Sequence, residues 1–239
     1  MIIIPARIGS TRFPSKVLAD IMGIPMVIRT AQAARELDTV VIATDSDEIV
    51  ELAERYGYRA VLTSPEHASG TDRIHEAAQK LGLKEDEIIL NVQADEPFIE
   101  HEVVEKVYTL TKERVDGERI LASSAYKIIS APEADDPNLV KVVTDEEEVA
   151  LYFSRAKIPY PRDHHFNRYK GHLGLYGYTM STLERYCALK PTALEEIEKL
   201  EQLRILAHGY RIAMTEVETE SFGIDTPEDL QRAIKKHLL

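Results

Sequence analysis

The chain opens with MIIIPARIGSTRFPSK, residues 1–16, in which an apolar run passes directly into a basic loop. Residues 1–4 are typical of a short buried strand, and we expect Pro5 to end it, because proline cannot donate a ladder hydrogen bond. The loop that follows contains three cations and no acid, namely Arg7, Arg12 and Lys16. Neighbouring cations repel one another, so the loop predicts an anion bound among them.

The composition is that of a globular protein and sets limits on its partners. Apolar residues make up 44% of the 239 residues. No apolar run approaches the roughly 20 residues needed to span a bilayer, and we expect no signal peptide. The single cysteine, Cys187, fits a reducing cytoplasm, and the net charge of −12 argues against nucleic acid as a partner. We therefore expect a cytoplasmic protein without a membrane partner, whose basic loop binds a small anionic substrate.

Strand-like and helix-like segments alternate through the first half of the chain. The strand-like runs are residues 1–4, 39–44, 59–64 and 87–92, and the helix-like runs are residues 24–38, 46–57 and 71–82. This alternation predicts an α/β fold with a mostly parallel sheet covered by helices. Ligands of such sheets bind beyond the carboxyl ends of the strands. We therefore expect the loop 5–16 and the segment QADEP, residues 93–97, to share one edge.

The second half of the chain is richer in strands. Beyond about residue 118 the strand-like runs are residues 119–128, 138–145, 148–156 and 171–180, with short connections between them. We interpret residues 1–239 as a single α/β domain with a β-rich insertion at roughly 119–190. Residues 211–217 predict a further strand, and residues 223–239 a loop and a terminal helix.

Residues 194–209 predict one strong amphipathic helix. The residues expected on its core face, at helical spacing, are Leu194, Ile197, Leu200 and Leu203. Glu198 and Gln202 then lie one turn apart off that face and could present an acceptor and an amide to one ligand. A solvated helix face is the alternative for this pair.

The basic loop has the outline of a phosphate site. A strand, a loop of small and basic residues and a helix supply backbone N–H groups, partial positive charge and whole cations. The loop is neither a Walker A loop nor a dinucleotide-binding turn, since Gly9 is its only glycine. Spacing alone leaves phosphate binding and a solvated basic loop as open alternatives.

Two aspartates are candidates for a metal site. Asp95 follows a predicted buried strand, and Asp225 follows the last predicted strand. Mg²⁺ is usually held by one or two carboxylates together with phosphate oxygens and water. Taken alone, Asp95 could be a turn or cap residue and Asp225 the N-cap before Pro227.

The sequence resembles the sugar-nucleotide cytidylyltransferases that activate ulosonic acids. Residues 3–18, IIPARIGSTRFPSKVL, are similar to the family pattern IPAR-x-x-STR-x-P-x-K-x-L. Further similar segments follow in order along nearly the whole chain: HASGTDR (67–73), NVQADEPFI (91–99), ALYFSRAKIPYPRD (150–163), HLGLYGY (172–178), LEEIEKLEQLR (194–204) and GIDTPEDL (223–230). The occurrence of these motifs in this order is a more specific sign of the family than any single motif. Ala94 is a departure, because family members usually have Gly there.

The resemblance implies a Rossmann-like, mostly parallel sheet of the nucleotide-diphospho-sugar transferase type. It implies a reaction in which CTP and an acidic sugar give a CMP-sugar and pyrophosphate, for lipopolysaccharide biosynthesis. The segments SRA-x-IP, HLG-x-YGY and LEQLR favour 3-deoxy-D-manno-octulosonate (Kdo) as the acceptor over sialic acid. A metal-dependent glycosyltransferase, with QADEP as its acidic motif, is a second candidate. The basic loop speaks against it, because a diphosphate donor needs less cationic charge.

The resemblance also assigns residues. The positions that match nucleotide-binding residues are Ala6, Arg7, Ser10, Arg12, Lys16, Ser69, Gly70, Arg73 and Gln93. The positions that match acceptor-binding residues are Gln93, Arg155, His172, Tyr176, Glu198 and Gln202. Asp95 and Asp225 match the ligands of Mg²⁺, and with Arg7 and Lys16 they are the predicted catalytic residues. A homodimer is implied, with the interface expected around residues 150–190.

Two of these assignments have simple alternatives. The HASGTDR loop could be a helix N-terminus capped by Thr71, and this role is compatible with nucleotide binding. His172 lies between Gly171 and Leu173, where a histidine is more often a packed polar residue than a ligand. The motif alone favours a substrate contact.

Overall fold

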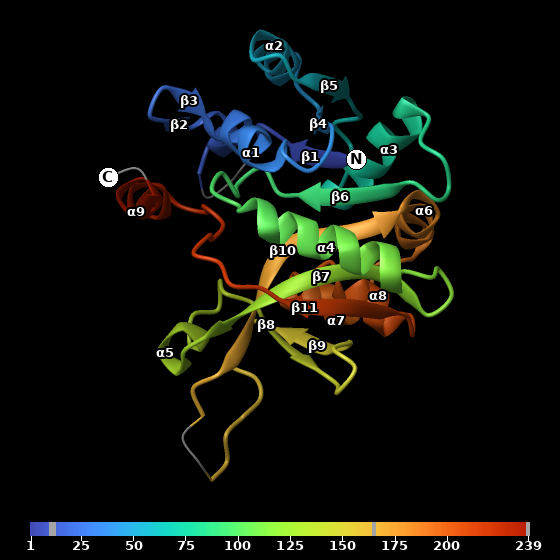
Figure 1. Cartoon of the computed structure of the whole chain (residues 1–239), viewed down its shortest axis with the longest axis vertical. Coiled ribbons are helices and arrows are strands. Elements are labelled where there is room, and N and C mark those ends of the chain that lie inside the picture. The colour runs from blue at the N-terminus through green and yellow to red at the C-terminus, as the bar shows by residue number, and fades with distance from the viewer. Residues whose placement is uncertain (10–12, 164–165, 238–239) are drawn as a thin grey trace. The chain divides into compact units, whose positions relative to one another are not determined.

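In the first part of the chain, four parallel strands alternate with helices as the sequence predicts (Figure 1). The computed structural model describes residues 1–9, 13–163 and 166–237. The chain divides into two units, the first formed by Met1–Glu105 with Glu220–Leu239 and the second by Lys106–Thr219. The β-rich insertion predicted at roughly 119–190 falls inside the second unit, and the single-domain interpretation stays a prediction.

The first unit contains a parallel sheet with the strand order β5-β4-β1-β6. Its strands are β1 (Ile2–Ala6), β4 (Val40–Thr44), β5 (Arg59–Leu62) and β6 (Ile88–Val92). All of β4 and nearly all of β1 and β6 is buried, as expected for parallel strands covered on both faces. The predicted α/β class is confirmed. The prediction that Pro5 ends the first strand is wrong, because Pro5 pairs with Ala43 inside β1. Pro5 is the second-last residue of β1, and the pairing of β1 with β6 involves Ile2 and Ile3, so the missing N–H falls near the end of the ladder.

The helices of the first unit follow the predicted positions closely. They are the 3₁₀ helix η1 (Lys16–Leu18), α1 (Met26–Ala34), α2 (Asp47–Arg55), α3 (Gly70–Leu81) and α9 (Pro227–His237), and a small hairpin of β2 (Asp20–Ile21) and β3 (Ile24–Pro25) precedes α1. Helix α3 packs against β1 and β4. Its N-cap is Ser69, so the alternative that Thr71 caps this helix is wrong. Helix α4 (His101–Arg114) begins in the first unit and ends in the second.

The second unit is built around a long central strand. Strand β7 (Ile120–Ile129) pairs antiparallel with β10 (Tyr169–Thr179) and parallel with β11 (Arg211–Glu216). Strand β8 (Lys141–Thr144) pairs with β10 and with β9 (Ala150–Ser154). Two helices, α5 (Ala131–Ala134) and α6 (Met180–Ala188), follow β7 and β10. The strand-like runs predicted in this part of the chain are therefore confirmed.

The prediction of one long helix over residues 194–209 is wrong. The structure has two short helices there, α7 (Ala193–Glu198) and α8 (Leu203–Ala207), because Lys199 adopts a left-handed conformation with φ of 54°. The predicted core face is interrupted as a result. Leu200 and Leu203 are buried, whereas Leu194 and Ile197 are 40% and 78% exposed.

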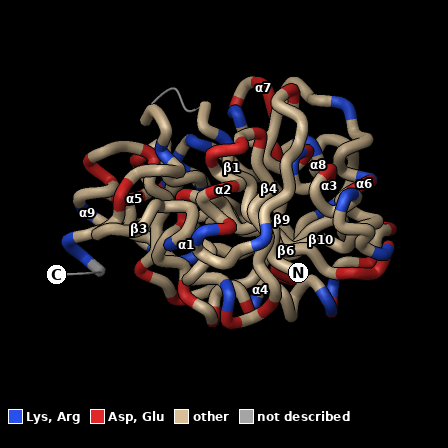
Figure 2. The backbone as a smooth tube through the Cα atoms, turned by 90° about the horizontal axis from the view of Figure 1, so that it is seen from above, with Lys and Arg blue, Asp and Glu red and all other residues tan. Residues whose placement is uncertain are grey.

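Charged residues are spread over both units. Figure 2 shows basic and acidic segments interspersed along the backbone, with acidic segments at α7, which carries Glu195, Glu196 and Glu198. Among the described residues, no helix is both long and apolar enough to cross a membrane.

Candidate active site

Lys16 lies between the two aspartates that were predicted to hold a metal ion. Its Nζ donates hydrogen bonds to Oδ2 of Asp95 at 2.6 Å and to Oδ1 of Asp225 at 2.9 Å. Lys16 is the last cation of the basic loop and the first residue of η1, Asp95 follows β6, and Asp225 precedes α9. The structure thus brings together three residues that are far apart in sequence, and it confirms that the first loop and QADEP meet at one edge of the sheet.

A backbone hydrogen bond holds the two aspartates together. The N–H of Ile224 donates to the carbonyl oxygen of Asp95 at 2.9 Å. The Ile224 side chain is fully buried in an apolar cluster with Ile21 and Met26, and this cluster anchors the segment before Asp225. Burial of apolar surface here therefore fixes a polar site next to it.

The cap of α9 is Thr226 and not Asp225. Thr226 Oγ1 accepts a hydrogen bond from the N–H of Asp229 at 3.1 Å, and Asp229 Oδ2 accepts one from the N–H of Thr226 at 3.1 Å. This is a reciprocal cap immediately before Pro227. The alternative that Asp225 is the N-cap is therefore wrong, and its carboxylate contacts Lys16 instead.

Two further side chains hold the segment around Asp95. The fully buried Thr30 donates from Oγ1 to the carbonyl oxygen of Ala94 at 2.9 Å. The buried carboxylate of Glu96 accepts from Ser221 Oγ at 3.0 Å. The residues on both sides of Asp95 are thus attached to α1 and to the segment before α9. Sequence analysis missed Thr30, although a threonine on the apolar face of a helix is a signal for such a role.

The carboxylates keep Lys16 charged. Burial by itself lowers the pKa of the Lys16 ammonium, but the negative charges and hydrogen bonds of Asp95 and Asp225 outweigh this effect and raise the pKa above its ordinary value.

The arrangement of the two aspartates also fits a divalent cation. Two carboxylate oxygens converge on one point, and no group of three or more His, Cys, Asp or Glu ligands occurs among the described residues. A site with two carboxylates is typical of Mg²⁺ bound jointly with phosphate.

The predicted nucleotide-binding residues of the first unit gather at the same strand ends. Ala6 is the buried last residue of β1, and the side chain of Arg7 next to it is exposed. Gly70 lies so close to β1 that a Cβ there would be 3.3 Å from Cγ of Pro5, and it would be 3.9 Å from Oε1 of Gln93. A side chain at position 70 would therefore require the Pro5 ring to shift by a few tenths of an ångström. The predicted residues Ser10 and Arg12 lie outside the described residues.

Arg73 has structural partners that sequence analysis missed. Its side chain is almost fully buried and donates from Nη2 to Asp45 Oδ2 at 2.8 Å and from Nη1 to Thr63 Oγ1 at 2.7 Å. These bonds join α3 to the ends of β4 and β5. Asp45 directly follows β4, and the reasoning that singled out Asp95 applies to it as well. A contact between Arg73 and a nucleotide stays a prediction.

Glu76 attaches the HASGTDR loop to α3. Its Oε2 accepts a hydrogen bond from the N–H of Ser64 at 2.9 Å and contacts Nε2 of His67, while its Oε1 contacts Lys80 Nζ at 2.7 Å. The loop ends at Ser69, whose hydroxyl accepts from the N–H of Asp72 at 3.1 Å. The carboxylate and the cap together fix the segment that was predicted to bind the nucleotide.

The second unit contains the other predicted acceptor-binding residues. The guanidinium of Arg155 donates to backbone carbonyls, from Nε to Glu198 at 2.8 Å and from Nη1 to Pro137 at 3.0 Å. The carboxylate of Glu198 accepts from Ser154 Oγ at 2.6 Å and from the N–H of Arg155 at 3.0 Å. The structure therefore joins Arg155 and Glu198 in one network. Gln202 is buried at the start of α8, so the prediction that it shares a helix face with Glu198 is wrong, because Lys199 ends α7 between them.

His172 and Tyr176 lie next to each other on β10. Their ring centroids are 5.4 Å apart, and the Nε2 of His172 lies 2.9 Å from Oγ of Ser124. Burial lowers the pKa of the His172 imidazole to about 3, so the ring is neutral near neutral pH. His172 is thus a packed histidine with a polar partner, and its contact with a substrate stays a prediction.

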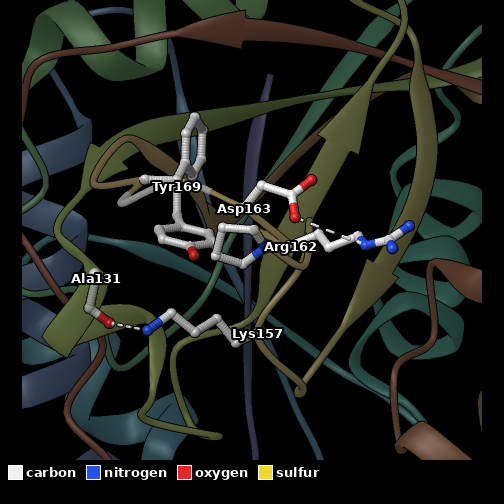
Figure 3. A pocket seen from close by; sticks show the side chains of 7 residues that line it. Ala131, Lys157, Arg162, Asp163 and Tyr169 are labelled. Carbon is white, nitrogen blue, oxygen red and sulfur yellow. Dashed lines mark hydrogen bonds and ion pairs between the residues drawn. The ribbon is translucent and has the colours of Figure 1, made fainter.

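A cavity of about 540 Å³ lies elsewhere in the second unit (Figure 3). Its lining includes Lys157, Arg162, Asp163 and the fully buried Tyr169. Lys157 Nζ donates to the carbonyl oxygen of Ala131 at 2.9 Å across one side of it. None of the residues predicted to bind nucleotide or acceptor lines this cavity.

Known proteins are similar to this chain over nearly its whole length. The family model described as "Cytidylyltransferase" matches residues 1–212. A protein of Nitratiruptor sp. named 3-deoxy-manno-octulosonate cytidylyltransferase is 59% identical over 232 residues, which cover 97% of each chain. A protein of the same name from Helicobacter pylori is 51% identical and covers 98% of this chain and 96% of its own.

A solved structure is similar as well. A CMP:2-keto-3-deoxy-manno-octonic acid synthetase complexed with CTP superimposes with a TM-score of 0.89 at 37% identity, covering 98% of this chain and 96% of that one. This similarity confirms the predicted α/β nucleotidyltransferase fold. Taken with the match to the family model, it shows that the chain belongs to the cytidylyltransferase family.

Proposed function

We propose that this protein transfers the cytidylyl group of CTP to Kdo and releases pyrophosphate. The observation that carries the proposal is the 59% identity, over nearly the whole of both chains, to a relative named for this reaction. The convergence of Lys16, Asp95 and Asp225 supplies the chemistry it needs. In the reaction, the oxygen of the anomeric hydroxyl of Kdo bonds to the α-phosphorus of CTP and gives up its proton. The bond from that phosphorus to the oxygen that bridges to the β-phosphate breaks, and pyrophosphate leaves.

The first unit would bind and orient CTP. Arg7 and Lys16, with Arg12 and Ser10 of the same loop, would bind the phosphates, because Arg forks and a Lys point charge suit phosphate oxygens. Ser69, Gly70 and Gln93 would contact the nucleoside or the α-phosphate. Asp95 and Asp225 would hold Mg²⁺, which, when bound, supplies positive charge for the phosphate oxygens. Positioning and electrostatic stabilisation of this kind account for most of the catalysis of phosphoryl transfer.

The second unit would bind the acceptor. Kdo carries a carboxylate and several hydroxyl groups, so it needs a cation and hydrogen-bonding groups. Arg155 and Glu198 are linked by hydrogen bonds, and this network gives their side chains defined positions. His172 would act as a neutral hydrogen-bonding group, and Tyr176 and Gln202 would contribute further polar contacts.

The setting of the enzyme is also part of the proposal. CTP is an intracellular nucleotide, so the reaction fits the cytoplasm, and CMP-Kdo would serve lipopolysaccharide biosynthesis. We propose a homodimer with its interface around residues 150–190. Exposed apolar side chains in this segment support that placement, with Leu151 50% and Tyr160 84% exposed.

Pyrophosphate release from purified protein tests the function. With CTP and Mg²⁺, release should require Kdo and should not occur with sialic acid. Release that occurs with sialic acid but not with Kdo would support the same mechanism with a different acceptor. Consumption of CMP-Kdo with transfer of its sugar, and no pyrophosphate release from CTP, would support a glycosyltransferase instead.

A further inference from the structure

The ammonium group of Lys16 lies at the point where the two proposed metal ligands converge. Oδ2 of Asp95 and Oδ1 of Asp225 both accept hydrogen bonds from this one nitrogen, at 2.6 and 2.9 Å. A divalent cation bound by the same two oxygens must displace the ammonium, because two cations at one position repel strongly. The inference that follows rests on the proposed function, in which these two aspartates hold Mg²⁺.

We propose that Lys16 is an internal counter-ion that excludes free divalent cations and makes metal binding depend on the nucleotide. Without a triphosphate, a metal ion has to compete with a cation that is tethered to the protein and already neutralises part of the charge of both carboxylates. A triphosphate changes this competition in two ways. It brings its own ligands for the metal, and its phosphate oxygens are alternative partners for the Lys16 ammonium.

The burial of Lys16 makes this competition effective. The Lys16 side chain is only 13% exposed, whereas Asp95 and Asp225 are 26% and 40% exposed. Solvent therefore screens these ion pairs less than a pair on an open surface. The backbone bond from Ile224 to Asp95 joins the segments that carry the two carboxylates independently of Lys16. Replacement of Lys16 by a neutral residue thus removes one positive charge from beside both carboxylates, and this removes a competitor for a divalent cation.

The geometry gives Lys16 a role in specificity beyond phosphate binding. A site that accepts free metal would be filled before the substrate arrives, in a geometry set by water and not by the phosphates. A site neutralised by Lys16 selects the metal together with CTP. Lys16 thereby couples the binding of the metal ion to the binding of CTP within one site.

Binding of Mn²⁺ alone, followed by electron paramagnetic resonance of the free ion, tests this proposal. The proteins to compare are the wild type, Lys16→Met, Lys16→Arg and the control Lys84→Met, whose exposed side chain lies on the loop between α3 and β6. Without nucleotide, we expect Lys16→Met to bind Mn²⁺ at least about tenfold more tightly than the wild type. Lys16→Arg keeps the charge and should bind like the wild type. Lys84→Met loses the same charge from a surface site and should also bind like the wild type.

Two further measurements make the outcome decisive. Asp95→Asn in the Lys16→Met background should abolish the gained affinity, which would place the ion at this site. Thermal unfolding checks that the variants fold, and Lys16→Gln serves as a second neutral variant. An Mn²⁺ affinity of both neutral variants equal to that of the wild type would overturn the proposal.

The same titration in the presence of CTP separates this inference from the proposed function, with Mn²⁺ and CTP without protein as the reference, because CTP itself binds Mn²⁺. Suppose that the wild type binds Mn²⁺ with CTP, but the neutral variants gain no Mn²⁺ affinity without CTP. This result would support the metal site and overturn only the role of Lys16. Wild-type protein that does not bind Mn²⁺ even with CTP would overturn both the metal site and the inference.

Discussion

The backbone N–H of Ile224 donates a hydrogen bond of 2.9 Å to the carbonyl oxygen of Asp95. Ile224 is fully buried, and the residue after it is Asp225, so this bond joins the backbone segments that carry the two carboxylates. The arrangement of the two proposed metal ligands thus depends on the packing of the C-terminal segment in the first unit. The site can therefore be weakened by changes in residues that touch neither substrate.

Thr30 positions Asp95 through the carbonyl oxygen of Ala94. Thr30→Val keeps the volume but leaves this buried carbonyl without its donor, which should lower the free energy of unfolding by about 1–3 kcal/mol. The activity should fall by about tenfold through misplacement of Asp95. Thr30→Ser restores the hydroxyl and should recover most of the activity. Urea unfolding and initial rates of pyrophosphate release measure the two effects. If Thr30→Ser and Thr30→Val release pyrophosphate at equal rates, the hydroxyl of Thr30 does not position Asp95.

Glu76 should contribute to stability in a pH-dependent way. Burial alone raises the pKa of its carboxyl, but Lys80, the N–H of Ser64 and His67 outweigh this effect and lower the pKa from 4.5 to about 2. A lowered pKa in the folded state gives stability that is present above the unfolded pKa and is lost as the pH falls through the folded pKa.

Glu76→Gln should therefore be less stable than the wild type at about pH 7, by roughly 1 kcal/mol after allowance for screening by solvent. The difference should vanish at about pH 2. Urea unfolding at several pH values measures it, with Glu66→Gln, an exposed glutamate directly before the HASGTDR loop, as the control. A difference that is independent of pH would contradict this account of Glu76.

The Glu76→Gln variant should also bind CTP more weakly, because the loop before Ser69 loses its hydrogen bonds to Glu76.

His172 should not titrate in the physiological range. Its pKa is lowered to about 3 by burial, so the imidazole stays neutral. The ring ¹⁵N signals of His172 should be constant from about pH 8 down to about pH 5, a range that includes the ordinary histidine pKa of about 6.5. Protonation of His172 within this range would mean that the ring is accessible to water and that its packing against Ser124 is not maintained.

The oligomeric state tests the proposed interface. Tyr160→Asp introduces a charge at a side chain that is 84% exposed within residues 150–190, and it should shift the protein from dimer to monomer. Tyr56→Asp, at a 40% exposed tyrosine of α2's C-terminus in the first unit, is the matched control and should leave the dimer intact. Sedimentation velocity measures both. A Tyr160 variant that remains a dimer places the interface elsewhere.

Sequence patterns predicted the elements of the first unit well, because strands buried on both faces and capped helices have strong local signals. They also predicted that Asp95 and the first loop meet, since both follow strands of one parallel sheet. The long helix at 194–209 could not be corrected from sequence, because its interruption depends on the left-handed conformation of Lys199, a residue type that rarely adopts it.

The hydrogen-bond partners of the site residues could also not be predicted from the sequence. The bonds from Thr30 to Ala94 and from Arg73 to Asp45 join elements that are separate in the chain, and no local pattern encodes such a contact. The position of Lys16 between two carboxylates likewise arises only when three segments pack together.

The most direct test of the account is the rate of Kdo-dependent pyrophosphate release from CTP in Asp95→Asn, in Asp225→Asn and in the double variant, with the exposed Asp86→Asn as the control. If the two carboxylates act as one cation site, each single variant should lose at least about 100-fold in rate, and the double variant should lose little more. The control should keep the wild-type rate. Single variants that retain nearly full activity, or losses that multiply in the double variant, would contradict a shared site.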